Sequence, residues 1–514
     1  MLTVDLVRRG AVRYGTRTAV IFGDQSLSFR AVDDAANRMA HVIGGLGIRP
    51  GDRVALLVNN GLWSIPVDFA CLKAGVARVP LNARLSADEH ERMLAETGAR
   101  LLVYSADLDE RALELAGRVD GLRLACLGPP ERPDDVDLFD AMKDASAADP
   151  LLPAGPDDVI LIIYTSGTTG QLKAAQHTQA SYAAIAANIL ANLVSPRRGD
   201  VMLHAASLIH ASGTFVLPYW LHGAVSAVLT GFDPGAYLDA IQEYRATAVN
   251  LVPTMLAMLF ASGEAQRTDV SSLDTIVYGA SPMPRPVIDE AMESWGPRFV
   301  QYYGQTEAPL CLTVLDKSDH LDPDRDTLLG SCGHPVVDAE LVVADGGGPV
   351  PTGEIGEIRV RAPFGMAGYY NAPELNAETL TGDGWIRTRD LARFDERGYL
   401  HLVDRTSDMI VTGGYNVYPR EVEDALMAHP GVAECAVVGA PDPTWVEAVT
   451  AFVVLAPGRA VGEEELRGAV RAGLAAYKVP KRIHVVDAIP KSAVGKILRR
   501  ALRDPLWAGR ERSI

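Results

Sequence analysis

Ten consecutive residues, 164–173, hold a concentrated set of phosphate-binding groups: three threonine hydroxyls, one serine hydroxyl, two glycines and a closing Lys173, with no acidic residue. Glycines allow tight turns that bring backbone N–H groups near phosphate oxygens, and the hydroxyls and the lysine add donors and positive charge. Only two residues separate Gly167 from Gly170, so the spacing is not that of Walker A. The residues predict a phosphate loop of another kind, with a surface turn as the alternative.

A second polar segment follows the apolar run 299–302 and consists of Tyr303, Gly304, Gln305, Thr306 and Glu307. The glycine permits close approach of the backbone to a ligand. The threonine hydroxyl suits a phosphate, and the glutamate offers the hard oxygen that Mg²⁺ prefers. A pentapeptide of this kind is a weak signal by itself, but its place after an apolar strand repeats the arrangement of the first loop.

Four other polar residues stand near turns: His210, Asp390, Arg405 and Lys496. Three of them have an ordinary structural explanation. A histidine beside an apolar turn usually completes the local structure, an aspartate in a turn is often merely exposed, and a lysine in a basic tail is usually a solvated charge. Their residue types alone therefore assign them no chemistry.

Taken in order, these segments resemble the signature motifs of the adenylate-forming superfamily, which contains acyl-CoA synthetases, firefly-type luciferases and the adenylation domains of peptide synthetases. The resemblance covers nearly the entire chain, and segments 413–419 and 490–497 are close to the usual family sequence. Five residues depart from it: Leu172 for proline, Ala174 for glycine, Arg389 for glycine, Ser407 for aspartate or lysine, and Val446 for glycine.

The resemblance implies a role for each matching residue. The phosphates of ATP would be held by Thr165, Ser166, Gly167, Thr168, Thr169, Gly170 and Lys173. The rest of the nucleotide would contact Gly279, Ala280, Ser281, Tyr303, Gly304, Gln305, Asp390 and Arg405, the last two at the ribose. Magnesium would bind Glu307 and Thr165, catalysis would depend on Lys496, Glu307, Thr306 and His210, and CoA would pass Gly413 and Gly414. The acid pocket is expected near Tyr182, His210, Ser212, Thr214, Tyr278, Gly279, Ala280 and Gly304.

The resemblance implies two reactions at one site. A carboxylate attacks the α-phosphorus of ATP, giving an acyl-AMP and pyrophosphate, and the thiol of CoA then takes the acyl group and releases AMP. Between these steps the C-terminal domain would rotate about a hinge at 405–408. Two alternatives stay open: an enzyme that adenylates the acid and passes it to a carrier protein or partner enzyme, and a nucleotide-binding protein without catalysis.

Strands and helices alternate around these motifs, which predicts an α/β fold. A large N-terminal domain, 1–404, should hold mostly parallel sheets flanked by helices, with a small β subdomain from about residue 339 to 370. The hinge 405–408 and a small, mobile C-terminal α/β domain, 409–514, should follow. The main expected strands are 53–58, 77–80, 159–163, 201–206, 248–251, 275–278 and 299–302, and the main expected helices are 31–46, 64–74, 86–97 and 179–193; residues 128–156 look like a surface connection.

The amino-acid composition argues against some classes of binding partner. The formal charge of −17 argues against nucleic acid or an acidic membrane surface as the main partner. Five scattered cysteines show no C-x-x-C pair, and neither a bilayer-spanning apolar run nor a signal peptide is evident, so we expect a cytoplasmic protein. We expect as partners a small carboxylic acid, with CoA or a carrier protein as acceptor. The acid is left open among fatty, aromatic and polycyclic types, and a homodimer is left open too.

Overall fold

The structure is a computed structural model that describes residues 1–166, 172–346, 348–491 and 496–508. The chain divides into two compact units. The first contains Met1–Gly167, Leu172–Leu341 and Val360–Ile386, and the second contains Val342–Arg359 and Arg387–Ile514. The described candidate residues of the two long loops, which include Thr165, Lys173 and Glu307, belong to the first unit, whereas Asp390, Arg405 and Lys496 belong to the second.

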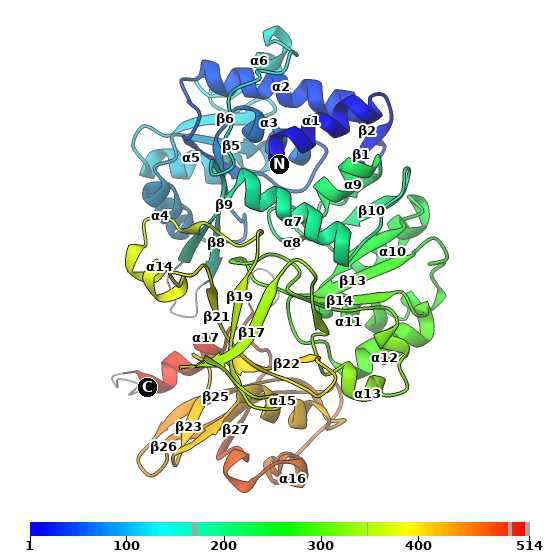
Figure 1. Ribbon diagram of the computed structural model, residues 1–514, viewed down its shortest axis with the longest axis vertical. Helices are drawn as coiled ribbons and strands as arrows, with labels where there is room; N and C mark the ends of the chain where they lie inside the picture. Colours follow the sequence, from blue (N-terminus) through cyan, green and yellow to red (C-terminus); the bar gives the residue numbers. More distant parts are fainter. Residues whose placement is uncertain (167–171, 347, 492–495, 509–514) are drawn as a thin grey trace. The chain divides into compact units, whose positions relative to one another are not determined.

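A nine-stranded sheet in the first unit combines strands of residues 18–28 with strands of residues 201–335 (Figure 1). Its order is β16 (His334–Pro335), β15 (Thr313–Leu315), β14 (Phe299–Tyr303), β13 (Thr275–Gly279), β12 (Ala248–Leu251), β10 (Val201–His204), β11 (Val225–Val228), β1 (Thr18–Phe22) and β2 (Gln25–Ser28). The strands from β14 to β1 are parallel, and the pairs at both edges are antiparallel. Because parallel strands share a direction, the ends of β10, β12, β13 and β14 lie along one edge of the sheet.

An eight-stranded sheet carries the first half of the chain. Its order is β20 (Gly368–Tyr369), β9 (Leu172–Thr178), β8 (Val159–Ser166), β4 (Ala77–Pro80), β3 (Arg53–Leu57), β5 (Leu101–Ser105), β6 (Arg123–Leu127) and β7 (Val136–Asp137). The strands from β8 to β7 are parallel, whereas β9 and β20 run antiparallel to their neighbours. The first polar loop therefore connects a hairpin, β8 to β9, at the margin of a parallel sheet.

Helices fill three layers around the two sheets (Figure 1). The layer between the sheets consists of α1 (Thr3–Tyr14), α2 (Phe29–Gly45), α3 (Ser64–Lys73), α7 (Gln179–Asn192) and α9 (Val216–His222). The far face of the nine-stranded sheet is covered by α10 (Pro234–Glu243), α11 (Pro253–Ala261) and α12 (Arg285–Trp295). The far face of the eight-stranded sheet is covered by α4 (Ala87–Thr97) and α5 (Asp109–Arg118). Short helices complete the unit: α6 (Leu138–Asp144), α8 (Ala211–Thr214), α13 (Arg325–Leu328) and α14 (Pro373–Thr379).

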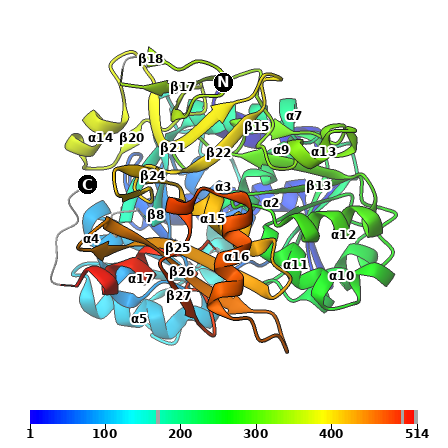
Figure 2. The same ribbon diagram turned by 90° about the horizontal axis from the view of Figure 1, so that it is seen from below.

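The second unit contains two further sheets (Figure 2). One has the order β18 (Gly348–Pro349), β17 (Glu340–Asp345), β19 (Gly356–Arg361), β21 (Ile386–Phe394) and β22 (Leu400–Arg405). The other has the order β24 (Tyr415–Val417), β23 (Ile410–Thr412), β26 (Val446–Leu455) and β25 (Val432–Asp442), with β27 (Arg482–Val485) beside β26. An apolar core joins this sheet to α15 (Pro419–Met427) and α16 (Glu463–Gly473), and α17 (Arg499–Arg503) follows Lys496.

The predicted fold class is confirmed, because parallel-rich sheets lie between helices and a small β-rich region follows. The boundaries of the predicted helices agree within two residues with α2, α3, α4 and α7. One prediction was wrong: segment 128–156 is more than a surface connection, since it contains β7 and α6. The side chain of Leu138 from α6 is buried against the inter-sheet core, which a Pro- and Asp-rich composition did not reveal. The domain boundaries at 404 and 409 stay predictions.

Candidate active site

The first polar loop begins and ends on paired strands. Thr165 of β8 lies opposite Lys173 of β9, and Ser166 lies opposite Leu172. The pairing places the Thr165 hydroxyl and the Lys173 cation on facing strands of one hairpin, an arrangement that suits a phosphate-binding loop. The predicted residues Gly167, Thr168, Thr169 and Gly170 lie outside the described residues.

The second polar segment turns sharply after β14. A side chain at Gly304 would bring its Cβ within 2.2 Å of the Leu310 carbonyl oxygen, so only glycine fits there. The Gln305 N–H donates to the carbonyl of Ala308, which closes the turn. The turn then presents Thr306 and Glu307 beyond the end of a parallel strand, where ligands of α/β proteins usually bind.

A buried histidine supports this turn. His177 of β9 is 1% exposed, and its Nε2 lies 2.9 Å from the backbone oxygen of Thr306. Because a carbonyl only accepts, the proton sits on Nε2. Burial lowers the pKa of His177 to about 4, which keeps the ring neutral. The strand that leaves the first loop thus holds the second loop in place, a contact that the sequence did not suggest.

Tyr369 joins the two loops. Its hydroxyl donates to Oε1 of Glu307 at 2.5 Å, and its ring lies 5.8 Å from the Lys173 ammonium group. Two hydrogen bonds from the Asn376 side chain to the Tyr369 backbone position this residue, which pairs with Ala175 on β9. A cation from the first loop and a carboxylate from the second therefore both contact the Tyr369 side chain. Sequence analysis missed Tyr369, although its Gly-Tyr-Tyr setting after the β region was visible.

His210 precedes α8, and its ring is oriented by an amide. The Asn82 side-chain nitrogen lies 3.1 Å from His210 Nε2, while Asn82 Oδ1 accepts from the backbone of Arg84. The amide nitrogen is a donor, so Nε2 accepts and Nδ1 carries the proton. Of the other expected pocket residues, Ser212 is buried, and Ala280 has a φ of 70°, a left-handed backbone that ends β13 sharply. Tyr278 instead faces α11 and α12, and its hydroxyl contacts His320 in that core.

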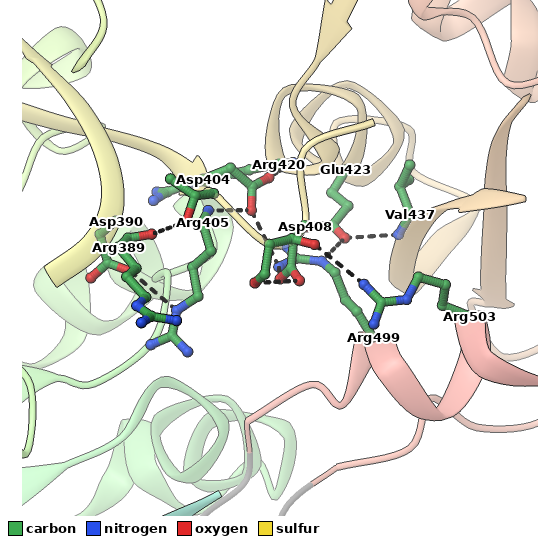
Figure 3. Close-up of polar contacts among 12 residues, drawn as sticks. Arg389, Asp390, Asp404, Arg405, Asp408, Arg420, Glu423, Val437, Arg499 and Arg503 are labelled. Carbon is green, nitrogen blue, oxygen red and sulfur yellow. Dashed lines mark hydrogen bonds and ion pairs between the residues drawn. The ribbon is translucent and has the colours of Figure 1, made fainter. Parts of the chain in front are cut away.

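The expected ribose residues are neighbours in the second unit (Figure 3). Asp390 of β21 and Arg405 of β22 are register partners, and Arg405 Nε donates to Asp390 Oδ1 at 3.1 Å. Asp390 is largely buried, whereas the Arg405 side chain is 44% exposed. A carboxylate oriented by an arginine can accept hydrogen bonds from vicinal hydroxyls.

A buried cluster of charges connects the predicted hinge with the segment after Lys496. Arg499 forms two hydrogen bonds to Glu423 and one to Asp408, and it lies 3.6 Å from Asp404 (Figure 3). Burial opposes its charge, but the three carboxylates hold the pKa of Arg499 above its usual range. Burial also raises the pKa of Asp404 to about 6.

A second arginine of α17 reaches the same region. Arg503 donates to the backbone oxygen of Ser407, the residue at the predicted pivot. Lys496 itself is exposed, and the next residue, Ile497, forms a bridge with Lys491. The pivot and the helix that follows Lys496 are therefore parts of one polar cluster. Sequence reasoning missed the two arginines of α17 because a basic tail looks like solvated charge.

Two departures from the usual family residues coincide with strained backbone. Arg389 has a φ of 62° and Val446 a φ of 69°, both in the left-handed region. Glycine is the usual family residue at both places, and it adopts this region without a steric cost. Gly413 and Gly414 also have positive φ values, of 58° and 83°. A β-branched valine at such a position is a genuine outlier.

Comparison with known proteins gives a consistent result. A family model described as AMP-binding enzyme matches residues 7–370, and one described as AMP-binding enzyme C-terminal domain matches residues 421–496. A feruloyl-CoA synthase from an Amycolatopsis species is 39% identical over 95% of each chain. The medium/long-chain-fatty-acid–CoA ligase FadD8 of Mycobacterium tuberculosis is 38% identical over 98% of this chain and 90% of its own. The structure of the amide bond synthetase McbA from Marinactinospora thermotolerans matches with a TM-score of 0.89 and 32% identity, over 98% of this chain and 99% of that one.

We expect Val446→Gly to stabilise the protein. The substitution removes a left-handed β-branched residue whose strain costs on the order of 1–2 kcal/mol, and Val446 is 56% exposed, so little packing is lost. The thermal midpoint should therefore rise. Val446→Ala keeps a Cβ at the same φ and serves as the control, with a smaller gain. A lower midpoint for the glycine variant would show that the valine is not strained.

We expect His177→Gln to weaken the dependence of stability on pH. His177 is neutral in the folded protein down to about pH 4, whereas an unfolded histidine takes up a proton below about pH 6.5. Its contribution is therefore complete above pH 6.5 and is lost as pH falls toward 4. Thermal midpoints measured from pH 7.5 to 4.5 should fall less steeply in the variant, whose amide N–H can still donate. Parallel curves for both proteins would exclude this role.

Proposed function

The chain belongs to the family of AMP-binding enzymes, and from that premise we propose how its own residues carry out the reaction. It is an AMP-forming acid–thiol ligase, which converts a carboxylic acid to a CoA thioester through an acyl-adenylate. Its relatives are named for feruloyl and fatty acids. One observation carries the assignment of residues: Lys173 and Glu307, from separate loops, meet at Tyr369.

The first reaction is a displacement at phosphorus. A carboxylate oxygen bonds to the α-phosphorus as the bond to the bridging oxygen breaks, and the electron pair leaves with pyrophosphate. The second reaction breaks the acyl–phosphate bond: the thiol sulfur bonds to the acyl carbon, its proton goes to solvent or a base, and AMP leaves. No covalent protein nucleophile is needed, so catalysis consists of positioning anions and stabilising charge on phosphorus.

We assign the triphosphate to the β8–β9 hairpin and the segment after β14. Lys173 and Thr165 lie opposite each other in the hairpin, and Thr306 adds a hydroxyl from the second segment. His177 and Tyr369 are positioning residues, because the first holds the backbone of Thr306 and the second orients Glu307. A site made from two loops in this way can grip a triphosphate at several oxygens at once.

Magnesium fits the residues present. The described residues contain no cluster of three or more His, Cys, Asp or Glu side chains that could hold a metal by themselves. Mg²⁺ commonly binds through one or two carboxylates together with substrate phosphates, and Glu307 offers one. Tyr369 donates to Oε1, so Oε2 is the oxygen that the ion would take. When bound, the ion would neutralise phosphate charge.

The second unit supplies the remaining groups. Asp390 and Arg405 would bind the ribose, Lys496 would bind the transferring carboxylate and α-phosphate, and residues 405–408 would act as the hinge. After rotation of residues 409–514, Gly413 and Gly414 would line the path of CoA. We propose CoA rather than a carrier protein as the acceptor, a cytoplasmic location where both ATP and CoA are held, and a homodimer as an arrangement to be tested by light scattering.

We expect Lys496→Ala to separate the two reactions. The lysine is exposed, so its removal should leave the thermal midpoint unchanged while adenylation falls by about 100-fold or more. Pyrophosphate release from acid and ATP measures the first reaction, and thioester formed from synthetic acyl-AMP and CoA measures the second. Lys491→Ala, on the same segment, is the matched control. Equal losses of activity in both reactions would contradict a specific role of Lys496 in adenylation.

We expect Tyr369→Phe to raise the magnesium requirement. Loss of one hydrogen bond to a charged group costs about 1.5–3 kcal/mol, so Glu307 should bind the ion about 10- to 100-fold more weakly. The measurement is the Mg²⁺ concentration that gives half-maximal pyrophosphate release at saturating ATP. Tyr370→Phe, one residue away, should leave this concentration unchanged. The proposed role is excluded if both variants need the same concentration as the parent protein.

A further inference from the structure

The loop that carries His210 is held by two asparagines from the other sheet of the first unit. The loop follows β10 of the nine-stranded sheet, whereas Asn60 and Asn82 follow β3 and β4 of the eight-stranded sheet. The Asn60 amide donates to the backbone oxygen of Ala206 at 3.0 Å, and its Oδ1 accepts from the N–H of Leu208 at 2.9 Å. Asn60 therefore fixes the backbone of the loop just before the histidine.

A close backbone contact fixes the other side of the same loop. An added Cβ at Gly213 would lie 1.8 Å from the carbonyl oxygen of Leu208, so only glycine fits there. The N–H of His210 donates to the carbonyl of Ser207, and the N–H of Gly213 donates to the carbonyl of His210. The histidine thus lies in a compact turn whose backbone is hydrogen-bonded on both sides.

Asn82 is itself held in one orientation. Its Oδ1 accepts from the N–H of Arg84 at 3.0 Å, and its backbone oxygen lies 2.9 Å from Nε2 of the buried His90. Nε2 of His90 therefore carries a proton, and Nδ1 of that ring accepts from Arg111. Because a backbone N–H only donates, Oδ1 of Asn82 must face Arg84. Nδ2 is then the atom that lies 3.1 Å from Nε2 of His210.

This contact decides which nitrogen of His210 can do what. A neutral imidazole has one donor and one acceptor, and the Asn82 amide occupies the acceptor at Nε2, so Nδ1 carries the proton. A second proton on Nε2 would set two N–H groups against each other, so the contact also opposes a charged ring. His210 can therefore donate a hydrogen bond from Nδ1, but neither nitrogen has a lone pair directed toward a substrate.

The pair of Asn82 and His210 lies where the two sheets present their phosphate-binding groups. Arg78 of β4 pairs with Leu161 of the parallel strand β8, and four residues farther along, the two chains reach Asn82 and Thr165. Neighbouring strands lie about 4.8 Å apart, so Asn82 follows its strand beside the first polar loop. The loop of His210 leaves the same edge of the nine-stranded sheet as the second polar segment after β14. Ligands of α/β proteins bind at such carboxyl ends of parallel strands.

We propose that Asn82 is a positioning residue of the ligase reaction, because its amide holds His210 as a neutral ring that donates from Nδ1 to the acyl group. The inference rests on the proposed ligase function and deepens it. In the first reaction, Nδ1–H binds the carboxylate oxygen that does not attack phosphorus.

The same donor serves the second reaction. The thiol sulfur bonds to the acyl carbon, and the carbonyl oxygen gains negative charge beside the Nδ1–H group of His210. The carbonyl then re-forms as the acyl–phosphate bond breaks, and AMP leaves with the electron pair. The thiol proton passes to water, since Nε2 of His210 is engaged by Asn82 and Nδ1 is already protonated.

Nitrogen NMR of the full-length protein tests the tautomer directly. Histidine-selective ¹⁵N labelling distinguishes a proton on Nδ1 from one on Nε2, and the signals missing from His210→Asn assign the ring. We expect the proton on Nδ1 in the parent protein. Asn82→Asp turns a carboxylate oxygen toward Nε2 and should place a proton there. A parent ring protonated on Nε2, or a spectrum that Asn82→Asp leaves unchanged, would overturn the inference.

Two substitutions of His210 distinguish a hydrogen-bond donor from a base. Asparagine keeps an N–H group near the place of Nδ1 but cannot take a proton, whereas leucine offers neither. The assay follows thioester formation from CoA and the synthetic acyl-AMP of the acid that the parent protein activates best in a panel of aryl and fatty acids. His210→Leu should slow this step about 100-fold, and His210→Asn should retain most of the rate. Equal losses in the two variants would indicate a base and contradict the proposal.

Asn82→Leu tests the positioning role in the same assay. Loss of one hydrogen bond should slow the step by about 10-fold, and adding Asn82→Leu to His210→Leu should cause no further loss, because both remove one interaction. Asn59→Leu is the matched control, since its amide donates to Asp107 instead. Fully additive losses, or an equal loss in the control, would exclude the role. A parent protein that forms neither acyl-AMP nor thioester from any acid of the panel would instead contradict the ligase function.

Discussion

The central constraint on this protein is electrostatic: several anions must meet inside a chain whose formal charge is −17. Global attraction cannot gather them, so the positive and donor groups have to be local and fixed. The structure meets this requirement by placing its groups at strand ends. Lys173 lies in the β8–β9 hairpin, Glu307 follows the end of β14, and Tyr369 contacts both side chains.

The same electrostatic constraint applies to the residue that positions the second polar loop. His177 holds a backbone carbonyl beside the anion-binding groups, and its own environment keeps it neutral. A charged imidazole there would add a donor but would also have to be desolvated in the interior, which is costly. A neutral ring in a fixed tautomer positions the loop without that desolvation free energy.

In the second unit, by contrast, charged side chains are buried, and their contacts hold neighbouring segments in fixed positions. Arg499 with Asp404, Asp408 and Glu423 forms a cluster whose desolvation is offset only by close and well-directed contacts. Removing one partner from such a cluster leaves an uncompensated charge, so the arrangement resists partial opening. The cluster joins residues 404–408 to the helix after Lys496 (Figure 3).

The sequence by itself determined most of the local features: four main helices within two residues, most of the main strands, the two polar loops and the family to which they belong. Apolar periodicity, capping residues and glycine spacing act over a few residues, so a single chain records them. Only the tertiary structure brought together Glu307 with Tyr369, 62 residues apart, and His177 with Thr306, 129 residues apart. It alone turned Tyr278 toward α11 and α12 and away from the expected acid pocket. Hydrogen bonds between distant segments, and the pairing or isolation of buried polar atoms, arise from packing, and no local pattern of residues encodes them.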